Sequence, residues 1–406
     1  MLHRLEIENY MSIRDAQVID LQVAGHAPES PERFSATWPG AAIKAPKVVA
    51  FFGANASGKS TVLRTLGLLG WFVRHSFHLA PDMSLPVEPS WSDGNTSRIT
   101  RMALHFSGPQ DIGAWTSSPS PDGVECRYAY EIEFGDQGDR RVVLTESLHY
   151  WPDSARRKVR LFERDQDEVV AGKEFQFSGH GPVLRKILRD NASVVSTLAQ
   201  LDHKPSLFLR DAAAKIVSNI LIEKHAIDEM TMLKFYQGNP AYLEAVNRDL
   251  RRIDLGIRSM NIESTGNGPR ATFEHEGLSK PVPLFLESHG TRNFLQIYPL
   301  IASVLAQGGI AVIDEMDLSI HPNVLPEILR WFYDGKRNRH HAQLWMTCQN
   351  ASLLEELVKE EVYFCEKDAD GATTVYGLHE IHGVRRVDNF YRKYMGGVYG
   401  AVPNLG

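Results

Sequence analysis

The N-terminal part of the chain shows strand-like and then helix-like hydrophobic patterns. Residues 2–21 alternate polar and apolar positions, which predicts two edge strands joined by a turn. The stretch 23–46 carries Pro, Gly and Ser, and we predict a loop there. Residues 47–53 form a short apolar run that stops at glycine, which is typical of a buried parallel strand. A helix is predicted next, because apolar residues follow at helical spacing, at Val62, Leu63, Leu66, Leu69 and Phe72.

Different hydrophobic patterns divide the rest of the chain. Alternating apolar residues separated by Gly-containing turns predict an antiparallel meander over 97–159. Helical spacing over 182–257, interrupted at Pro205 and Pro240, predicts a compact helical insertion and excludes a long coiled coil. Strand and helix patterns then alternate again toward the C-terminus. We therefore predict an α/β fold with an antiparallel β lobe, organised as an N-terminal lobe, a helical insertion and a C-terminal lobe over 1–180, 181–260 and 261–406.

The amino-acid composition excludes several classes of protein but does not indicate a reaction. The 406 residues are 43% apolar and 23% charged, which excludes collagen and wholesale disorder. No run approaches the ~20 apolar residues of a membrane span, and the first residues lack a signal-peptide pattern, so we expect a cytoplasmic protein without a membrane partner. The net charge of -6 means that any contact with nucleic acid must depend on a local basic patch. Cys126, Cys348 and Cys365 show no metal-ligand spacing and are predicted to be buried.

The most specific motif follows the predicted buried strand. Residues 53–61 satisfy G-x-x-x-x-G-K-[ST] between a strand and a helix, which is the context of a phosphate-binding P-loop. Backbone N–H groups of such a loop surround phosphates, Lys59 would neutralise them, and the Ser60 hydroxyl would coordinate Mg²⁺. The alternative is a Gly- and Ser-rich turn that only caps a helix. The predicted nucleotide-binding residues are Gly53, Asn55, Ala56, Ser57, Gly58, Lys59, Ser60 and Thr61.

A second motif lies at 309–315, where an apolar strand ends in two carboxylates. We interpret it as a Walker B strand in which Asp314 holds Mg²⁺ and Glu315 orients or deprotonates the attacking water. Adjacent residues of a strand point to opposite sides, so the two carboxylates can have different roles. The alternative is a pair of acids that only ends the strand before a turn.

These motifs together resemble the ATPase heads of the ABC class, in the branch that contains SMC and DNA-repair ATPases, OLD proteins and abortive-infection ATPases. The opening segment at 7–15, IENYMSIRD, is similar to the first strand pair of that branch. Glu287–Thr291, before a predicted helix, resembles its signature motif. The resemblance implies that Ser288 and Gly290 reach across a dimer to the γ-phosphate on the other subunit's P-loop. Taken alone, this segment could also be a simple helix cap.

The resemblance extends past the Walker B pair. Residues 314–322 are similar to the D-E-x-[DE]-x-x-L-H-P run of OLD and abortive-infection ATPases, which implies a D-loop at Asp317–Ile320. We predict that His321 is a structural residue that fixes the turn before Pro322, and the alternative is a catalytic histidine. At the end of the next strand, Gln349 stands where the family has a histidine beside the γ-phosphate. Because an amide can donate a hydrogen bond but cannot exchange a proton, we expect slow hydrolysis. The glutamine of the family's Q-loop has no evident match.

The resemblance implies an ATP-binding and hydrolysing switch that uses ATP and Mg²⁺. It implies a homodimer or a higher homo-oligomer that controls an effector encoded nearby, a nuclease or toxin, in antiphage defence. The alternatives are an ATPase of the SMC and OLD class that acts directly on nucleic-acid ends, and a binding module that uses ATP only for structure. Nucleic acid is a possible partner. The helical insertion has a possible phosphate-binding face, which ordinary solvent-exposed helix charges would also explain, at Lys215, Lys224, Lys234, Arg248, Arg251, Arg252 and Arg258. Phe390 and Tyr394 of the C-terminal segment are predicted to pack on the ATPase core.

Overall fold

A computed structural model describes residues 1–23, 31–92, 95, 97–113, 124–152, 157–221, 228–253, 256–266 and 268–403. At its centre lies a six-stranded sheet with the order β11-β15-β16-β5-β17-β18, in which only β18 runs antiparallel to its neighbour. The strands are β5 (Val48–Phe52), β11 (Ile216–Ser218), β15 (Ile310–Ile313), β16 (Gln343–Thr347), β17 (Val362–Lys367) and β18 (Thr373–Gly377). Helix α1 (Lys59–His75) follows β5, so the predicted order of strand, glycine-rich turn and helix is confirmed.

Both faces of this sheet are buried, and β5 shows why its sequence is a continuous apolar run. Val49 and Phe51 pack into the hydrophobic cluster that contains α1. Val48, Ala50 and Phe52 point to the opposite face and pack into a second cluster. The second cluster contains residues of α7 (His289–Gln307), α8 (Val324–Tyr333) and α9 (Phe390–Met395). An alternating strand buried on both sides must be apolar at every position.

A second, seven-stranded antiparallel sheet has the order β10-β9-β8-β7-β6-β1-β2. The predicted meander and the predicted N-terminal strand pair are confirmed, and β1 joins them because it pairs with β6. Part of the predicted loop at 23–46 is instead a two-stranded ribbon, β3 (Phe34–Ala36) and β4 (Lys44–Pro46). The strands of the large sheet are β1 (Leu2–Glu8), β2 (Gln17–Asp20), β6 (Thr100–Pro109), β7 (Glu125–Gln137), β8 (Arg140–Trp151), β9 (Val159–Asp165) and β10 (Glu168–Ala171).

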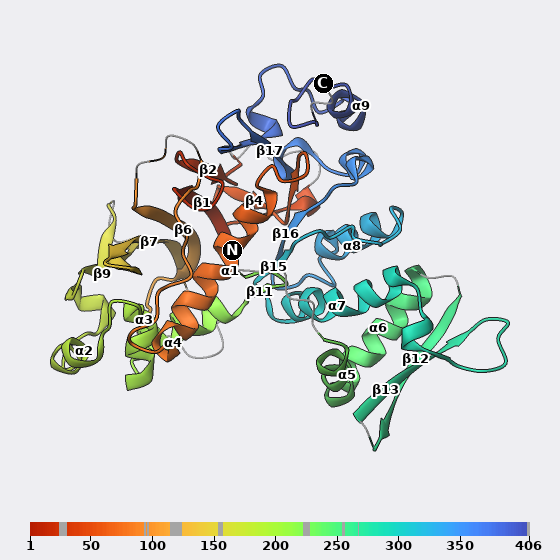
Figure 1. The fold of residues 1–406 in the computed structure, drawn as a ribbon, viewed down its shortest axis with the longest axis horizontal. Coiled ribbons are helices and arrows are strands. Elements are labelled where there is room, and N and C mark those ends of the chain that lie inside the picture. The colour runs from red at the N-terminus through yellow and green to blue at the C-terminus, as the bar shows by residue number, and fades with distance from the viewer. Residues whose placement is uncertain are drawn as a thin grey trace.

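The helices between 181 and 260 do not form one lobe, and this corrects the sequence-based prediction. Helices α2 (Gly181–Ile187), α3 (Val194–Leu198) and α4 (Lys204–Ala214) share the hydrophobic cluster of α1. Helices α5 (Glu229–Gly238) and α6 (Pro240–Ile253) belong to the other cluster, beside a small sheet of β12 (Ile257–Thr265), β13 (Gly268–His275) and β14 (Val282–Pro283). The chain divides at β11, which enters the central sheet next to β15, so α5 and α6 lie far from α2 and α3 (Figure 1).

The C-terminal segment returns to the central sheet. Phe390 and Tyr394 are buried, and the Tyr394 ring stacks on Phe364 of β17 with ring centroids 5.2 Å apart, as predicted for this segment. The three cysteines are also buried, as predicted. Among the described residues, no helix combines the length and the apolar character needed to cross a bilayer. The predicted α/β P-loop fold with an antiparallel β lobe is confirmed, whereas its helical insertion is split.

Candidate nucleotide-binding site

The loop between β5 and α1 is held against the two C-terminal strands of the central sheet. Gly53 and Gly58 have φ angles of +147° and +100°. A side chain at Gly53 would collide with the Cys365 carbonyl oxygen of β17, and one at Gly58 would collide with the Thr373 side chain at the start of β18. Thr373 also donates a hydrogen bond to the Ser57 carbonyl oxygen over 3.0 Å. Glycine is therefore required at both positions by backbone conformation and by close approach.

Lys59 and Ser57 show that this loop is suited to an anion. The Lys59 ammonium group donates to the carbonyl oxygens of Gly53 and Ala54, each at 2.8 Å, and its burial lowers the pKa of Lys59. The Ser57 hydroxyl oxygen is buried and has no hydrogen-bond partner among the residues that the structure describes. A phosphate would receive both donors at the N-terminus of α1, where the backbone N–H groups also point.

The predicted metal ligands lie together although they are far apart in sequence. The Ser60 hydroxyl donates to the Asp314 carboxylate, at 2.9 and 3.1 Å from its two oxygens. Thr347, at the end of β16, donates to the same carboxylate over 2.7 Å, and its hydroxyl accepts the backbone N–H of Glu315. One hydroxyl and one carboxylate are hard oxygen ligands of the kind that Mg²⁺ prefers, with phosphate oxygens and water completing its octahedron. The residues present therefore fit Mg²⁺.

Asn219 is a positioning residue that sequence reasoning missed. It follows β11 directly, and its side-chain amide donates to the Asp314 carbonyl oxygen over 3.1 Å and accepts the Asp314 backbone N–H over 2.8 Å. This pair of hydrogen bonds fixes the backbone of the predicted metal ligand. The available signal was a polar residue at the end of a very short apolar segment, KIVSN, inside a helical pattern.

The predicted catalytic residues line the same cavity as the P-loop. This cavity has a volume of about 650 Å³, and Glu315 and Gln349 both contribute to its wall. The backbone N–H of Gln349 donates to the Asp317 carboxylate over 2.9 Å, which ties the predicted D-loop to the end of β16. Sequence reasoning missed part of the rim, which is formed by Met11, Arg64, Trp91 and Lys367.

The predicted signature residues lie elsewhere. Ser288 caps the N-terminus of α7, where its hydroxyl accepts the Thr291 backbone N–H over 3.0 Å. Gly290 lies so close to the Ser319 carbonyl oxygen that a side chain there would collide with it, so the start of α7 packs against the predicted D-loop. Ser288 and Gly290 are not among the described residues that line the P-loop cavity.

An exposed apolar surface surrounds the start of α7. The exposed fractions of Phe285 and Leu286 are 64% and 66%, and that of Leu318 in the D-loop is 48%. The D-loop is fixed to α7 because Asn293 donates to the Leu318 carbonyl oxygen over 2.7 Å. His321 has the predicted structural role, since its ring nitrogen accepts the backbone N–H of Asn323 in the next turn. We call Phe285, Leu286, Ser288, Gly290 and Leu318 the signature face.

The solved structures that are similar to this chain include three SMC head domains. The head domain in the complex of SmcHead with the C-winged helix domain of ScpA is 13% identical, with a TM-score of 0.49, over 93% of this chain and 97% of that chain. An SMC head domain from Thermotoga maritima is 15% identical, with a TM-score of 0.41, over 93% and 98%. An Smc head domain derived from Pyrococcus furiosus is 12% identical, with a TM-score of 0.45, over 93% and 96%.

A family model provides the stronger comparison. No curated protein matches this chain. The model described as "AAA domain, putative AbiEii toxin, Type IV TA system" matches residues 48–355, which include the P-loop, the Walker B strand and the signature face. The match covers more than half of the chain, and the chain therefore belongs to this family of AAA-domain ATPases.

Proposed function

We propose that the protein is an ATP-hydrolysing switch in which two copies close around two ATP molecules. The observation that carries this proposal is the separation of two sets of residues. Lys59 and Ser60 line one cavity and Asp314 accepts a hydrogen bond from Ser60, whereas Ser288 lies on an exposed apolar face outside this cavity. A second copy related by a two-fold axis would bring its signature face to this P-loop and receive the same contact in return.

The residues of the cavity have distinct roles in this proposal. Lys59 and the backbone N–H groups of the P-loop bind the β- and γ-phosphates. Ser60 and Asp314 hold Mg²⁺, which neutralises phosphate charge when it is bound. Glu315 orients or deprotonates the attacking water, and Thr347 keeps its backbone in place by accepting its N–H over 2.7 Å. Gln349 donates a hydrogen bond toward the γ-phosphate and supplies no proton, which makes hydrolysis slow.

We infer that the output of the switch is an effector protein encoded nearby, a nuclease or toxin that acts in antiphage defence. The family description, which refers to a toxin and a toxin–antitoxin system, supports this direction. A switch of this kind needs a partner, because closing two heads around ATP performs no chemistry on another substrate. We propose more specifically that the protein is an abortive-infection ATPase of the AbiL or OLD type and that it acts in the cytoplasm.

A mixing experiment tests the shared sites. Lys59→Ala removes phosphate binding, and Ser288→Arg blocks the signature face, so each variant alone should be inactive. In a heterodimer, however, the P-loop of the Ser288→Arg copy meets the intact signature of the Lys59→Ala copy. Mixing equal amounts should restore phosphate release to at most about half of the wild-type rate, because each mixed dimer has one complete site and neither variant forms an active dimer by itself.

The same variants provide the controls. Ser288→Arg should bind ATP with unchanged affinity but remain monomeric with ATP in light scattering, since only its contact with the other copy is lost. Dimers of Ser288→Arg with ATP, or no recovered turnover in a mixture of folded variants, would show that the signature residues do not act in trans. Adding duplex DNA to the wild type tests the alternative of direct action on nucleic acid, which requires stimulated turnover.

A further inference from the structure

The seven basic residues that the sequence suggested as one face do not lie together. Lys215 lines an apolar cavity near the first residues of the chain, and Arg258 lies 3.8 Å from Glu276 in an exposed ion pair. Lys234 lies on α5, and Lys224 is outside the described residues. Three arginines of α6, at 248, 251 and 252, do gather at one cavity of about 720 Å³ between α6 and α7. This cavity shares no described residue with the P-loop cavity.

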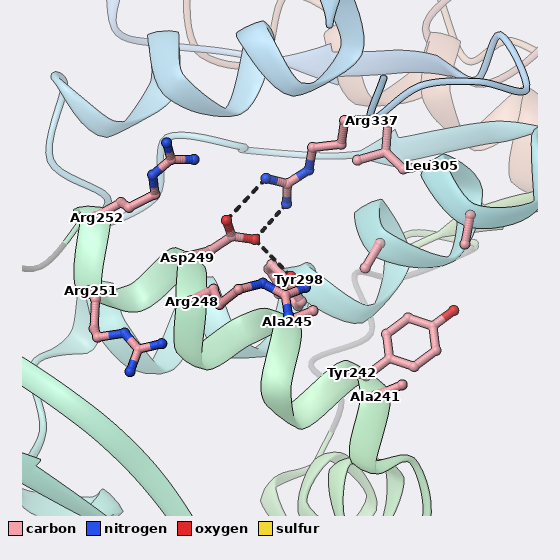
Figure 2. A pocket seen from close by; sticks show the side chains of 12 residues that line it. Ala241, Tyr242, Ala245, Arg248, Asp249, Arg251, Arg252, Tyr298, Leu305 and Arg337 are labelled. Carbon is pink, nitrogen blue, oxygen red and sulfur yellow. Dashed lines mark hydrogen bonds and ion pairs between the residues drawn. The ribbon is translucent and has the colours of Figure 1, made fainter. Parts of the chain in front are cut away.

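The acidic residue in this cavity is already neutralised. Asp249 forms an ion pair with Arg337, with contacts of 3.0 and 2.5 Å to its two carboxylate oxygens, and it also accepts a hydrogen bond from Tyr298 over 2.8 Å. Arg337 in turn lies 3.8 Å above the ring centroid of Trp331. Figure 2 shows Arg337 facing Asp249 from the wall opposite α6. This internal pair is structural, and the described residues that line the cavity include no further acidic side chain for the other arginines.

Those remaining arginines form a positive cluster on one helical turn. Arg248 contacts Glu244 over 3.2 Å, but both side chains are mostly exposed, so this pair is weak. Arg251 and Arg252 form no ion pair within the described part of the chain. Like charges at positions i and i+4 repel, as Arg248 and Arg252 do here. The helix dipole favours two cations, Arg251 and Arg252, in the last turn of α6. The dipole does not explain why these side chains line a cavity.

The rest of the wall is mostly apolar, and four of its side chains are alanines. Ala241 and Ala245 of α6 face Ala302 and Ala306 of α7, and their small size leaves the space open. The half-buried ring of Tyr242 borders it. The volume lies within the range of small-molecule sites, roughly 300 to 1,000 Å³, in which a few polar groups orient a ligand above an apolar wall.

We propose that this cavity binds a nucleoside phosphate or a similar small phosphorylated molecule at a second site, separate from the ATP site. Guanidinium groups bind phosphate oxygens in pairs, so Arg248 and Arg252 hold the phosphates, with Arg251 beside them. The alanine wall and Tyr242 receive the planar part of the ligand. Duplex DNA fits less well, because one helical turn of about 5.4 Å spans only one backbone phosphate, whereas DNA binding needs several phosphate contacts in a row. An acidic peptide also fits less well, because it has no planar group to contact the alanine wall and Tyr242.

Calorimetry with ADP in a Lys59→Ala background tests this site apart from the P-loop. The double variant Arg248→Gln, Arg252→Gln removes two exposed cavity charges. The matched control is Arg258→Gln, Arg270→Gln, which removes two exposed charges of the same lobe outside the cavity. We expect ADP to bind the background and the control equally, and at least tenfold more weakly to the cavity variant. Pyrophosphate should bind the background more weakly than ADP, since it leaves the apolar wall empty.

Each other outcome overturns the proposal. No ADP binding in the background, or equal binding by all three proteins, would show that the arginines form no ligand site. Pyrophosphate binding as tight as that of ADP would rule out a nucleoside phosphate. Loss of duplex DNA or of polyglutamate binding in the cavity variant, without ADP binding, would assign the arginines to a nucleic acid or an acidic protein. Failure of the ATP site itself is distinguishable, because the wild type and Lys59→Ala would then bind ATP equally.

Discussion

The nucleotide cavity and the signature face are built in opposite ways. Around the cavity, side chains that are far apart in the sequence converge on each other, since Ser60 of α1 and Thr347 of β16 both bond to the buried Asp314 carboxylate. On the signature face, Ser288 bonds to Thr291 of its own helix, and its apolar neighbours Phe285 and Leu286 remain about two-thirds exposed. The polar groups around the nucleotide cavity bond to one another within the chain, whereas the apolar side chains of the signature face remain exposed to solvent.

This difference indicates which surface would gain free energy by binding a partner. Covering part of the exposed area of Phe285 and Leu286 would stabilise a complex by about 1.5 to 3 kcal/mol in total. Leu318 extends the same surface across the D-loop, which Asn293 fixes to α7. The cavity also has one exposed apolar side chain on its rim, Trp91, but it differs in offering a buried hydroxyl without a hydrogen-bond partner among the described residues, at Ser57. Function at the nucleotide cavity should therefore be sensitive to substitutions of polar side chains, and association through the signature face should be sensitive to the loss of apolar area.

The largest effect is expected from Lys59→Ala. Its side chain is buried, and its ammonium group is held at the P-loop by two carbonyl oxygens, which places the charge where a phosphate would bind. ATP affinity should fall by two orders of magnitude or more, on the order of 3 kcal/mol for a lost charge-assisted contact, measured by calorimetry. The matched control is Lys367→Ala, an exposed rim lysine of the same cavity, which should cost tenfold at most. Equal losses in both variants would remove the phosphate assignment of Lys59.

Glu315→Gln should separate binding from turnover inside the same region. The amide keeps the size and the backbone hydrogen bond to Thr347 but cannot take a proton. We expect phosphate release to fall by roughly 10² to 10³-fold, ATP affinity to stay within about twofold, and dimers to accumulate with ATP and Mg²⁺ in light scattering. Normal turnover would show that a different group activates the water.

A smaller effect, on association alone, is expected from Phe285→Ser with Leu286→Ser. These exposed residues contribute little to the monomer fold, so ATP affinity should be unchanged. The dimer dissociation constant measured in the Glu315→Gln background should rise by about 10 to 100-fold, as the lost apolar area predicts. Val398→Ser provides the control, because Val398 is equally exposed but lies near α9. An equal loss from Val398→Ser would move the interface away from the signature face.

The residues of the nucleotide cavity could be predicted from the sequence better than the packing of the elements around it. The P-loop and the Walker B strand are local patterns, and a continuous motif determines both the residues and their immediate geometry. Asn219 was missed because its role depends on β11 lying parallel to β15, and a strand of three residues carries too little periodicity to be recognised. The same strand divides the predicted helical insertion, so one missed element caused both errors. The contribution of Ser288 in trans stays a prediction, since a single chain carries only half of that site.

The smallest effect is expected at Gln349, which borders the cavity from the strand next to the Walker B strand. Its backbone is tied to Asp317 of the D-loop, so a substitution should change the side chain without moving the strand. Gln349→His would add a group with a pKa near ~6.5 that can carry charge beside the γ-phosphate, and turnover should rise by less than about tenfold. The gain should grow as the pH falls from about 8 to 6.5, because protonated imidazole stabilises the developing negative charge, whereas the wild type should lack this dependence. Gln349→Ala is the control, and we expect it to lower turnover a few-fold. If neither variant changes phosphate release at any pH, the side chain at 349 does not contact the γ-phosphate, and slow hydrolysis needs another cause.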